Sequence, residues 1–178
     1  MAILNDRASE QACVTRRLDE VRAIITQASK SEHLPPVGHI GSADGYTWSS
    51  SVWESQLAAQ TITHFPADQA AALSRVYHLL ASVGDANNEE RKAWLTLQTM
   101  VGPGRPIDPA SITQLIEADD TARAANSVFA FEEPVIRRIL MNGGLGRDFP
   151  QVDSHNAPIL SGHWFICRPI GNQAPNTY

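Results

Sequence analysis

The two cysteines have the most definite chemistry in this sequence. Cys13 and Cys167 are the only cysteines among 178 residues, and each stands beside apolar neighbours. They could be two separate buried thiols, the usual state of isolated cysteines in a cytosolic protein. They could also form a disulfide that closes a loop of about 150 residues, which would stabilise the folded chain by about 4–5 kcal/mol. The residues alone leave both interpretations open.

Histidines near the C-terminus could bind a metal ion. Asp153, His155 and His163 lie close together in the sequence and could converge on one ion. The chain would then be a metal-dependent enzyme that uses the histidines of its tail. Scattered histidines are more often surface or hydrogen-bonded groups, and no motif places two of them on one helical face. We therefore expect no metal, no cofactor and no catalytic residue.

Four polar residues interrupt the apolar faces of two long helices that the sequence predicts. They are Asn87 and Arg91 in one helix, and Asp119 and Asn126 in the other. If the helices are antiparallel, Arg91 comes near Asp119. Such groups often pair, or turn to water, and then only fix the register of the helices. They could instead line a pocket, because bundles build ligand sites between helices, and the chain would be a small-molecule-sensing bundle.

Three aromatic residues around an irregular segment could contact a partner. Tyr46, Trp48 and Trp53 lie at the end of, or just after, a stretch rich in proline and glycine, residues 33–46. Aromatic side chains on irregular segments supply rigid contact area in protein interfaces. Trp53 also fits a place in the core. These three residues form the candidate partner surface.

Two helices are predicted in the first third of the chain. The first spans residues 6 to about 29, where four apolar residues recur at helical spacing, namely Val14, Leu18, Val21 and Ile25. The second begins at a capping box, Ser51-Val52-Trp53-Glu54, and ends near His64 because Pro66 disfavours helical geometry in the residue before it.

Two longer helices are predicted after them. The third runs from Pro66 to about Met100, although Gly84 and the polar residues 85–90 weaken its centre. A turn of glycine and proline, residues 102–106, ends it. Asp108 then caps a fourth helix that has Pro109 at its first position and ends at about Met141. Pro134 should kink this helix.

The predicted fold is all-α, an irregular four-helix arrangement built on a long antiparallel hairpin of the third and fourth helices. The proline- and glycine-rich loop and a long C-terminal coil would pack over it. We expect one domain, residues 1–178, with a helical core at 1–141 and an extended tail at 142–178. Two apolar patches would anchor the tail, Ile159-Leu160 and Trp164-Phe165-Ile166.

The composition argues against nucleic acid as a partner. The net charge is −5, the only lysines are Lys30 and Lys92, and no basic cluster is interleaved with aromatic residues. No run approaches the ~18–20 apolar residues that span a bilayer. The chain as written is therefore expected to be soluble.

Several short runs together resemble uncharacterised bacterial envelope proteins that have one membrane helix near the N-terminus and a helical soluble part. The runs are Ala12-Cys13 with Arg17-Leu18-Asp19, Tyr46-Thr47-Trp48 with Val52-Trp53, Val101-Gly102-Pro103-Gly104-Arg105, and Ile166-Cys167-Arg168-Pro169. The membrane helix of those proteins is missing here.

The resemblance implies a periplasmic domain that is anchored to the inner membrane in its full-length form, with a cytoplasmic location as the alternative. It favours the Cys13–Cys167 disulfide, because the periplasm is oxidising. It implies no activity. We therefore expect a non-enzymatic, extracytoplasmic interaction or accessory domain whose partner is another envelope protein.

Overall fold

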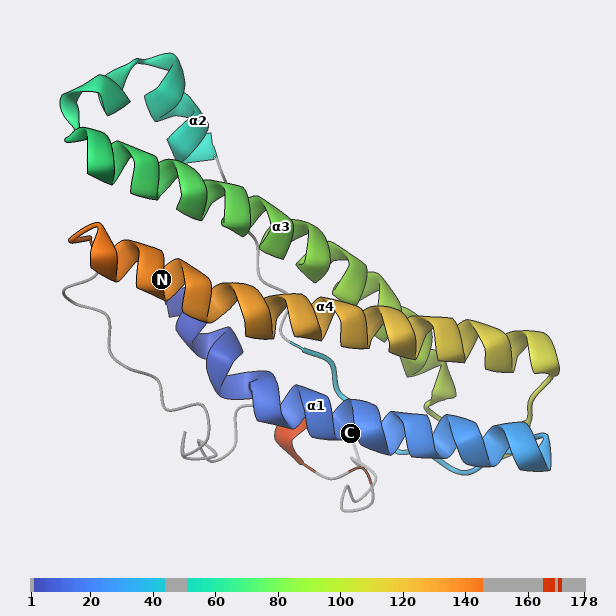
Figure 1. Ribbon diagram of the computed structural model, residues 1–178. Helices are drawn as coiled ribbons and strands as arrows, with labels where there is room; N and C mark the ends of the chain where they lie inside the picture. Colours follow the sequence, from blue (N-terminus) through green and yellow to red (C-terminus); the bar gives the residue numbers. More distant parts are fainter. Residues whose placement is uncertain (1, 44–50, 146–164, 169, 171–178) are drawn as a thin grey trace, which may run out of the picture.

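Three long helices dominate the fold. The computed structural model describes residues 2–43, 51–145, 165–168 and 170. The long helices are α1 (Ala2–Ser31), α3 (Ala67–Leu97) and α4 (Pro109–Asn142). Helix α4 runs antiparallel to both of the others and packs along each of them (Figure 1). The all-α prediction and the antiparallel hairpin of α3 and α4 are therefore confirmed.

The predicted second helix is shorter than expected. Helix α2 covers Ser51–Ala58, and a separate 3-10 turn, η1, covers Thr61–His64, at the end of the molecule where α3 begins (Figure 1). Between them Gln60 has a φ of 55°. A helix cannot continue through this left-handed conformation. The expectation of one helix to residue 64 is therefore wrong.

Helices α3 and α4 are continuous where the sequence predicts weak points. Gly84 and the polar residues after it lie inside α3, and Pro134 lies inside α4. The ends of α4 follow the prediction. Its cap Asp108 accepts hydrogen bonds from the backbone nitrogen of Ser111 at 2.9 Å and from the Ser111 hydroxyl at 2.7 Å.

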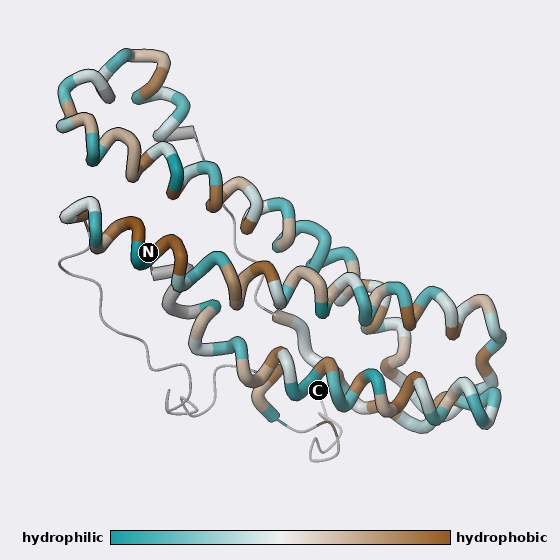
Figure 2. Tube along the Cα trace, in the orientation of Figure 1, coloured by the Kyte–Doolittle hydropathy of each residue, from teal (hydrophilic) through white to brown (hydrophobic). Residues whose placement is uncertain are grey.

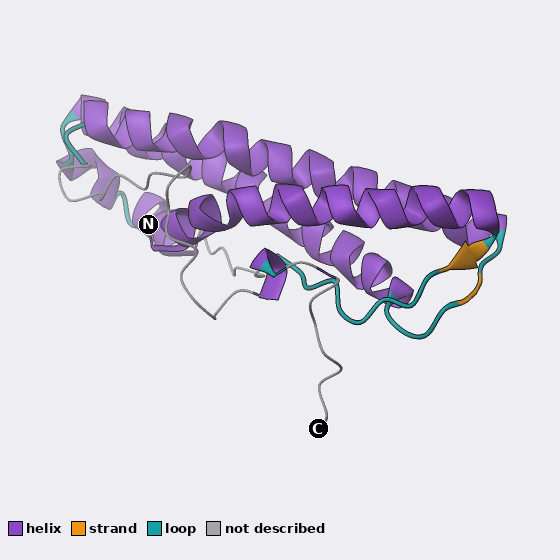
Figure 3. Ribbon diagram, turned by 90° about the horizontal axis from the view of Figure 1, so that it is seen from below, coloured by secondary structure: helices purple, strands orange, loops and turns teal. Residues whose placement is uncertain are grey.

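A short sheet joins the loop after α1 to the turn before α4. Strand β1 (His33–Leu34) pairs antiparallel with β2 (Arg105–Pro106), with His33 opposite Pro106 (Figure 3). Val37 and Gly102 exchange two further backbone hydrogen bonds, of 2.8 and 2.9 Å. The proline- and glycine-rich segment therefore lies against the α3–α4 turn. The sequence did not indicate these strands.

Two apolar clusters form the core. The larger joins α1, the loop after it, the end of α3 and the start of α4, and it contains all four predicted apolar residues of α1. The smaller lies between the other halves of α3 and α4, and its buried members are Val76, Val83, Phe129, Ile136 and Leu140. Figure 2 shows hydrophobic and hydrophilic residues interspersed along each long helix, as expected for amphipathic helices.

A disulfide joins the C-terminal part of the chain to α1. Cys13 of α1 is bonded to Cys167 of a 3-10 turn, η3 (Phe165–Cys167), and their Cα atoms lie 4.7 Å apart. Ile166 is buried in the larger core. Arg16 donates to the carbonyl of Cys167, and Arg17 donates to the carbonyls of Arg168 and Ile40. The predicted disulfide is confirmed, and Ile166, one residue of a predicted anchor patch, lies in the core.

Other predictions for the tail lie outside the described residues, among them the anchors Ile159-Leu160 and Trp164. Among the helices that the structure describes, none combines the length and the apolar character needed to cross a bilayer.

Candidate functional site

Buried polar residues gather where α1, α3 and α4 meet. Five of them are less than 10% exposed, namely Arg7 and Glu10 of α1, Asn87 and Glu90 of α3, and Asn126 of α4. Buried charged groups are rare unless they are paired, because a charge loses its hydration on burial. This cluster is therefore the most unusual chemistry in the described part of the chain.

Arg7 is the centre of the cluster. Its Nη2 donates to Glu90 Oε1 at 2.8 Å and to Asn126 Oδ1 at 2.9 Å. Its guanidinium carbon lies 4.5 Å from the centre of the Phe129 ring, which is a cation–π contact. The other two guanidinium nitrogens, Nε and Nη1, are buried and have no hydrogen-bond acceptor among the described residues. One side chain thus joins three helices and retains unused donors.

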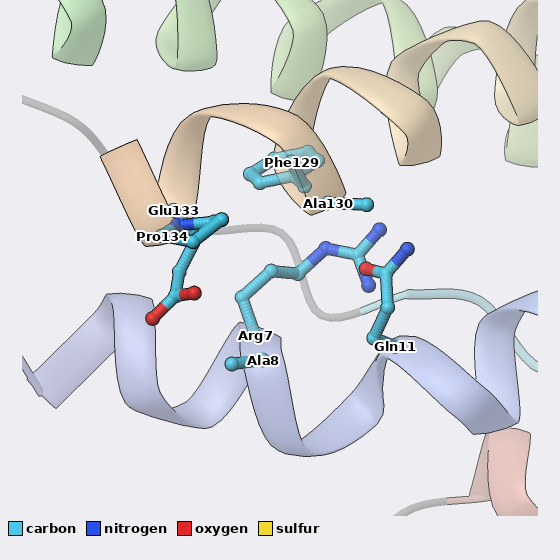
Figure 4. Close-up of a pocket in the computed structure, with 7 residues that line it drawn as sticks. All are labelled: Arg7, Ala8, Gln11, Phe129, Ala130, Glu133 and Pro134. Atoms are coloured by element: carbon cyan, nitrogen blue, oxygen red, sulfur yellow. The ribbon is translucent and has the colours of Figure 1, made fainter. Parts of the chain in front are cut away.

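A cavity of about 240 Å³ lies beside Arg7, between α1 and α4. Figure 4 shows the Arg7 side chain reaching from α1 toward α4, between Gln11 and Phe129. The residues around the cavity are Arg7, Ala8, Gln11, Phe129, Ala130, Glu133 and Pro134. Most of this wall is apolar, and its polar groups come from both helices.

Two polar residues of the wall are held by neighbours. Gln11 donates from Nε2 to the carbonyl of Asn126 at 3.1 Å. Glu133 forms an ion pair with Arg137, one turn further along α4. The pKa of Arg137 is lowered by burial. Gln11 and Glu133 are therefore held in place at the edge of the cavity.

Glu90 is the counter-ion that burial affects most clearly. Burial raises the pKa of its carboxyl above the usual value, while the positive charge of Arg7 acts in the opposite direction. The positive charge of Arg7 is therefore balanced by a carboxylate that is itself buried away from water.

The four predicted ligand residues are only partly brought together. Asn87 and Asn126 belong to the buried cluster, and Asn126 contacts Arg7. Asp119 is fully buried but forms ion pairs with Arg22 of α1 and Arg123 of α4. Arg91 is exposed and lines a different recess of about 160 Å³ with Trp94 and others. The predicted approach of Arg91 to Asp119 is thus replaced by pairing of Asp119 with other arginines.

The candidate partner surface is described at one residue only. Trp53 is half-buried and stacks on Tyr77 of α3, with ring centres 4.5 Å apart and planes 7° apart. Its ring therefore packs within the fold. Tyr46 and Trp48 lie outside the described residues, as do Asp153, His155 and His163. In the part of the chain that is described, no three His, Cys, Asp or Glu side chains are placed to hold a metal ion.

Three residues of the buried polar cluster were not among the predicted ligand residues, although the sequence contains a signal for them. Arg7 and Glu10 continue the apolar face of α1 backward from Val14, in steps of four and three residues. On α3, Glu90 lies at helical spacing between Asn87 and Trp94. Charged residues at such positions face neighbouring helices. Extending each apolar face in both directions identifies them.

Comparisons with family models, with curated proteins and with solved structures give no match to this chain. What the cavity can bind follows from its own donors, walls and charges.

Proposed function

We propose that this chain is an extracytoplasmic domain that binds a small molecule in the cavity between α1 and α4. The observation that carries the proposal is the recess of about 240 Å³ between the two helices, which is lined by apolar side chains and a few polar ones. Such a combination of apolar walls with a small number of fixed polar groups is typical of small-molecule sites.

The disulfide supports the extracytoplasmic part of the proposal. Disulfides form and persist in oxidising compartments and are rare in the cytosol. The Cys13–Cys167 bond therefore favours such a compartment over the cytoplasmic alternative. A location in the periplasm, with an anchor in the inner membrane, is the narrower proposal, and it is supported by the resemblance to envelope proteins.

The sequence favoured a domain that interacts with another protein, whereas small-molecule binding is proposed here. An interaction with another envelope protein stays a prediction, because Trp53 packs on Tyr77 and the other two aromatic residues are outside the described part. An enzyme that uses the tail histidines stays a prediction as well. Among these candidates, the cavity is the one whose residues the structure describes.

A fragment screen with a cavity-filling variant tests the proposed function. Ala130 lines the cavity and Ala124 is an exposed residue of the same helix that does not. We expect ligand-observed NMR to find fragments that bind the wild-type protein and Ala124→Phe but no longer bind Ala130→Phe. Fragments that bind Ala130→Phe as well as the wild type, or a screen without binders, would contradict the proposal.

A further inference from the structure

The wall of the cavity formed by α4 offers a backbone acceptor. Pro134 lies inside α4, and proline has no N–H, so the carbonyl of Ala130 loses the donor that the fourth residue along a helix normally supplies. This carbonyl lies on the helix surface between Ala130, Glu133 and Pro134, and all three residues line the cavity. An N–H on a ligand would replace the missing donor of the helix.

The carboxylate of Glu133 is a second acceptor on the same wall. Figure 4 shows it extending from α4 toward α1, beside Pro134. The side chain is 19% exposed, so a ligand can reach it. Arg137 donates to one of its oxygens, Oε1. The two oxygens of a carboxylate can together accept about four hydrogen bonds, so the bond from Arg137 leaves capacity for a ligand.

The side-chain donors of the opposite wall are occupied or out of reach. Nη2 of Arg7 donates to Glu90 and Asn126, while Nε and Nη1 of Arg7 are fully buried. Nε2 of Gln11 donates to the carbonyl of Asn126. Among the described residues of the cavity, the groups that a ligand can reach are therefore mainly acceptors. They favour a ligand that donates hydrogen bonds.

The charges around the cavity favour a cation over an anion. The arginines that line it or lie beside it are paired, Arg7 with Glu90 and Arg137 with Glu133. Glu10 adds a further carboxyl group on the same buried face of α1 as Arg7. An anion would lose its hydration without meeting an unpaired positive charge, whereas an ammonium group would meet the carboxylate of Glu133.

The size and the apolar walls restrict the rest of the molecule. The cavity of about 240 Å³ is smaller than the roughly 300–1,000 Å³ typical of sites for drug-sized ligands. Phe129, Pro134 and two alanines supply apolar surface. A compact apolar group such as one ring or a short branched chain matches these walls.

From these contacts we infer that the ligand is a small primary amine in its ammonium form, which donates to the Glu133 carboxylate and the Ala130 carbonyl and lays an apolar group against Phe129. The inference rests on the proposed function and specifies the chemical class of its ligand. Glu133 selects the positive charge, and Pro134 leaves the backbone carbonyl open to the ligand.

Three probes with the same ring test the inference. Benzylamine is an ammonium ion at neutral pH, benzyl alcohol has an uncharged donor, and benzoate has acceptors with a negative charge. In NMR titrations of the wild-type, oxidised protein at pH 7, we expect benzylamine to bind with a Kd about tenfold lower than either of the others. The reason is that hydrogen bonds between an ionised donor and a carboxylate are stronger than those of a neutral donor.

A pair of glutamine variants tests the role of the charge. Glu133→Gln keeps the size of the side chain but removes its negative charge, so the Kd of benzylamine should rise about tenfold and its advantage over benzyl alcohol should disappear. Glu117→Gln makes the same exchange at an exposed position of α4 outside the cavity and should leave the Kd unchanged. A Kd of benzylamine that Glu133→Gln does not raise would overturn the inference.

Pro134→Val tests the role of the backbone carbonyl. Valine keeps an apolar side chain of similar size but brings an N–H that bonds to the carbonyl of Ala130. The Kd of benzylamine should therefore rise about threefold or more. The variant should unfold at the same or a higher temperature, because α4 regains a backbone hydrogen bond, so weaker binding cannot be ascribed to a damaged fold. An unchanged Kd would overturn the inference.

The remaining outcomes separate the inference from the proposed function. Tighter binding of benzyl alcohol or benzoate in the cavity would overturn the amine as the ligand class but leave the proposed function standing. If none of the probes binds at millimolar concentration, the inference fails, and the fragment screen with Ala130→Phe then decides the proposed function separately.

Discussion

Arg7 and Glu90 form an ion pair from which the surrounding helices exclude water. Their side chains are 2% and 3% exposed. In such a pair the loss of hydration opposes the attraction of the charges, so the pair as a whole contributes little to stability. Removing one partner is different, because it leaves the other charge buried and alone. The consequences of mutation therefore depend on whether one charge or both are removed.

We predict that Arg7→Met destabilises the protein by about 3–5 kcal/mol, because the Glu90 carboxylate loses its buried partner. The double variant Arg7→Met with Glu90→Gln should lose less than the sum of the two single variants. Urea denaturation of all four proteins measures this double-mutant cycle. Arg138→Met, at an exposed position, should cost less than about 0.5 kcal/mol. Additive losses would show that the two charges do not interact.

The raised pKa of Glu90 predicts a dependence of stability on pH. Because burial raises this pKa, Glu90 retains a proton in the folded protein at pH values where the unfolded chain has lost it. Its contribution to stability is complete below the unfolded pKa and is lost as the pH rises through the folded pKa. Glu90→Gln cannot ionise, so the stability difference between wild type and variant should change across this interval.

Thermal unfolding at a series of pH values measures the difference. The exposed neighbour Glu89 is the control, and Glu89→Gln should show no comparable change. A constant difference between wild type and Glu90→Gln over the acidic range would mean that Glu90 titrates alike in the folded and unfolded chain.

At the level of single residues, the sequence predicted only part of the buried polar cluster. Asn87 and Asn126 were identified because they interrupt apolar faces, and both are buried. Arg91 was chosen by a step of four residues from Asn87, whereas the buried residue, Glu90, is three residues away. Steps of three and four both occur along one face of a helix. Whether Glu90 or Arg91 faces inward depends on where α1 packs, and this is a property of the tertiary structure.

The helices themselves were predicted more closely than their ends and neighbours. Gly84 and Pro134 did not end α3 and α4, since burial against other helices outweighs local propensity in long amphipathic helices. The boundary that failed is at Gln60, where a left-handed residue separates α2 from η1. Gln has no special preference for that conformation, so the sequence carried no signal for it.

Because η3 lies tightly against the loop after α1, we predict that Gly41→Ala destabilises the protein. Gly41 has a φ of +72°, and a Cβ there would lie 3.2 Å from Ile166 Cα. Gly144 has a φ of +69°, but a Cβ there would meet nothing within 4 Å. Gly144→Ala should therefore cost about 1–2 kcal/mol for the backbone alone, and Gly41→Ala should cost more because η3 must also move. Urea denaturation of both variants tests this, and equal losses would exclude a tight contact.

The disulfide acts on the whole molecule, because it closes a loop across a sequence separation of 154 residues. We predict that Cys13→Ser with Cys167→Ser lowers the free energy of unfolding by about 5 kcal/mol, since the unfolded chain regains the entropy that the closed loop removes. Reduction of the wild-type protein should give the same loss in urea denaturation. A stability that is unchanged by reductant would contradict this.

Over the whole chain, the sequence predicted the all-α class and the α3–α4 hairpin from apolar spacing and from the turn at residues 102–106. It left the disulfide open until the resemblance was considered, because pairing of distant cysteines depends on the tertiary fold. It did not predict the β1–β2 pair, since a strand of two residues is too short for any periodic pattern.

The bond between residues 13 and 167 makes the backbone between them a closed ring that contains α3, α4 and most of α1. A protease that cleaves one peptide bond in the exposed turn at Pro103 and Gly104 would open this ring without dividing the molecule. The two cut ends would stay close together, because each continues into a helix packed on its neighbour. Electrophoresis without reductant would show a single species with the mass of the intact chain, and two fragments would separate only after the disulfide is reduced.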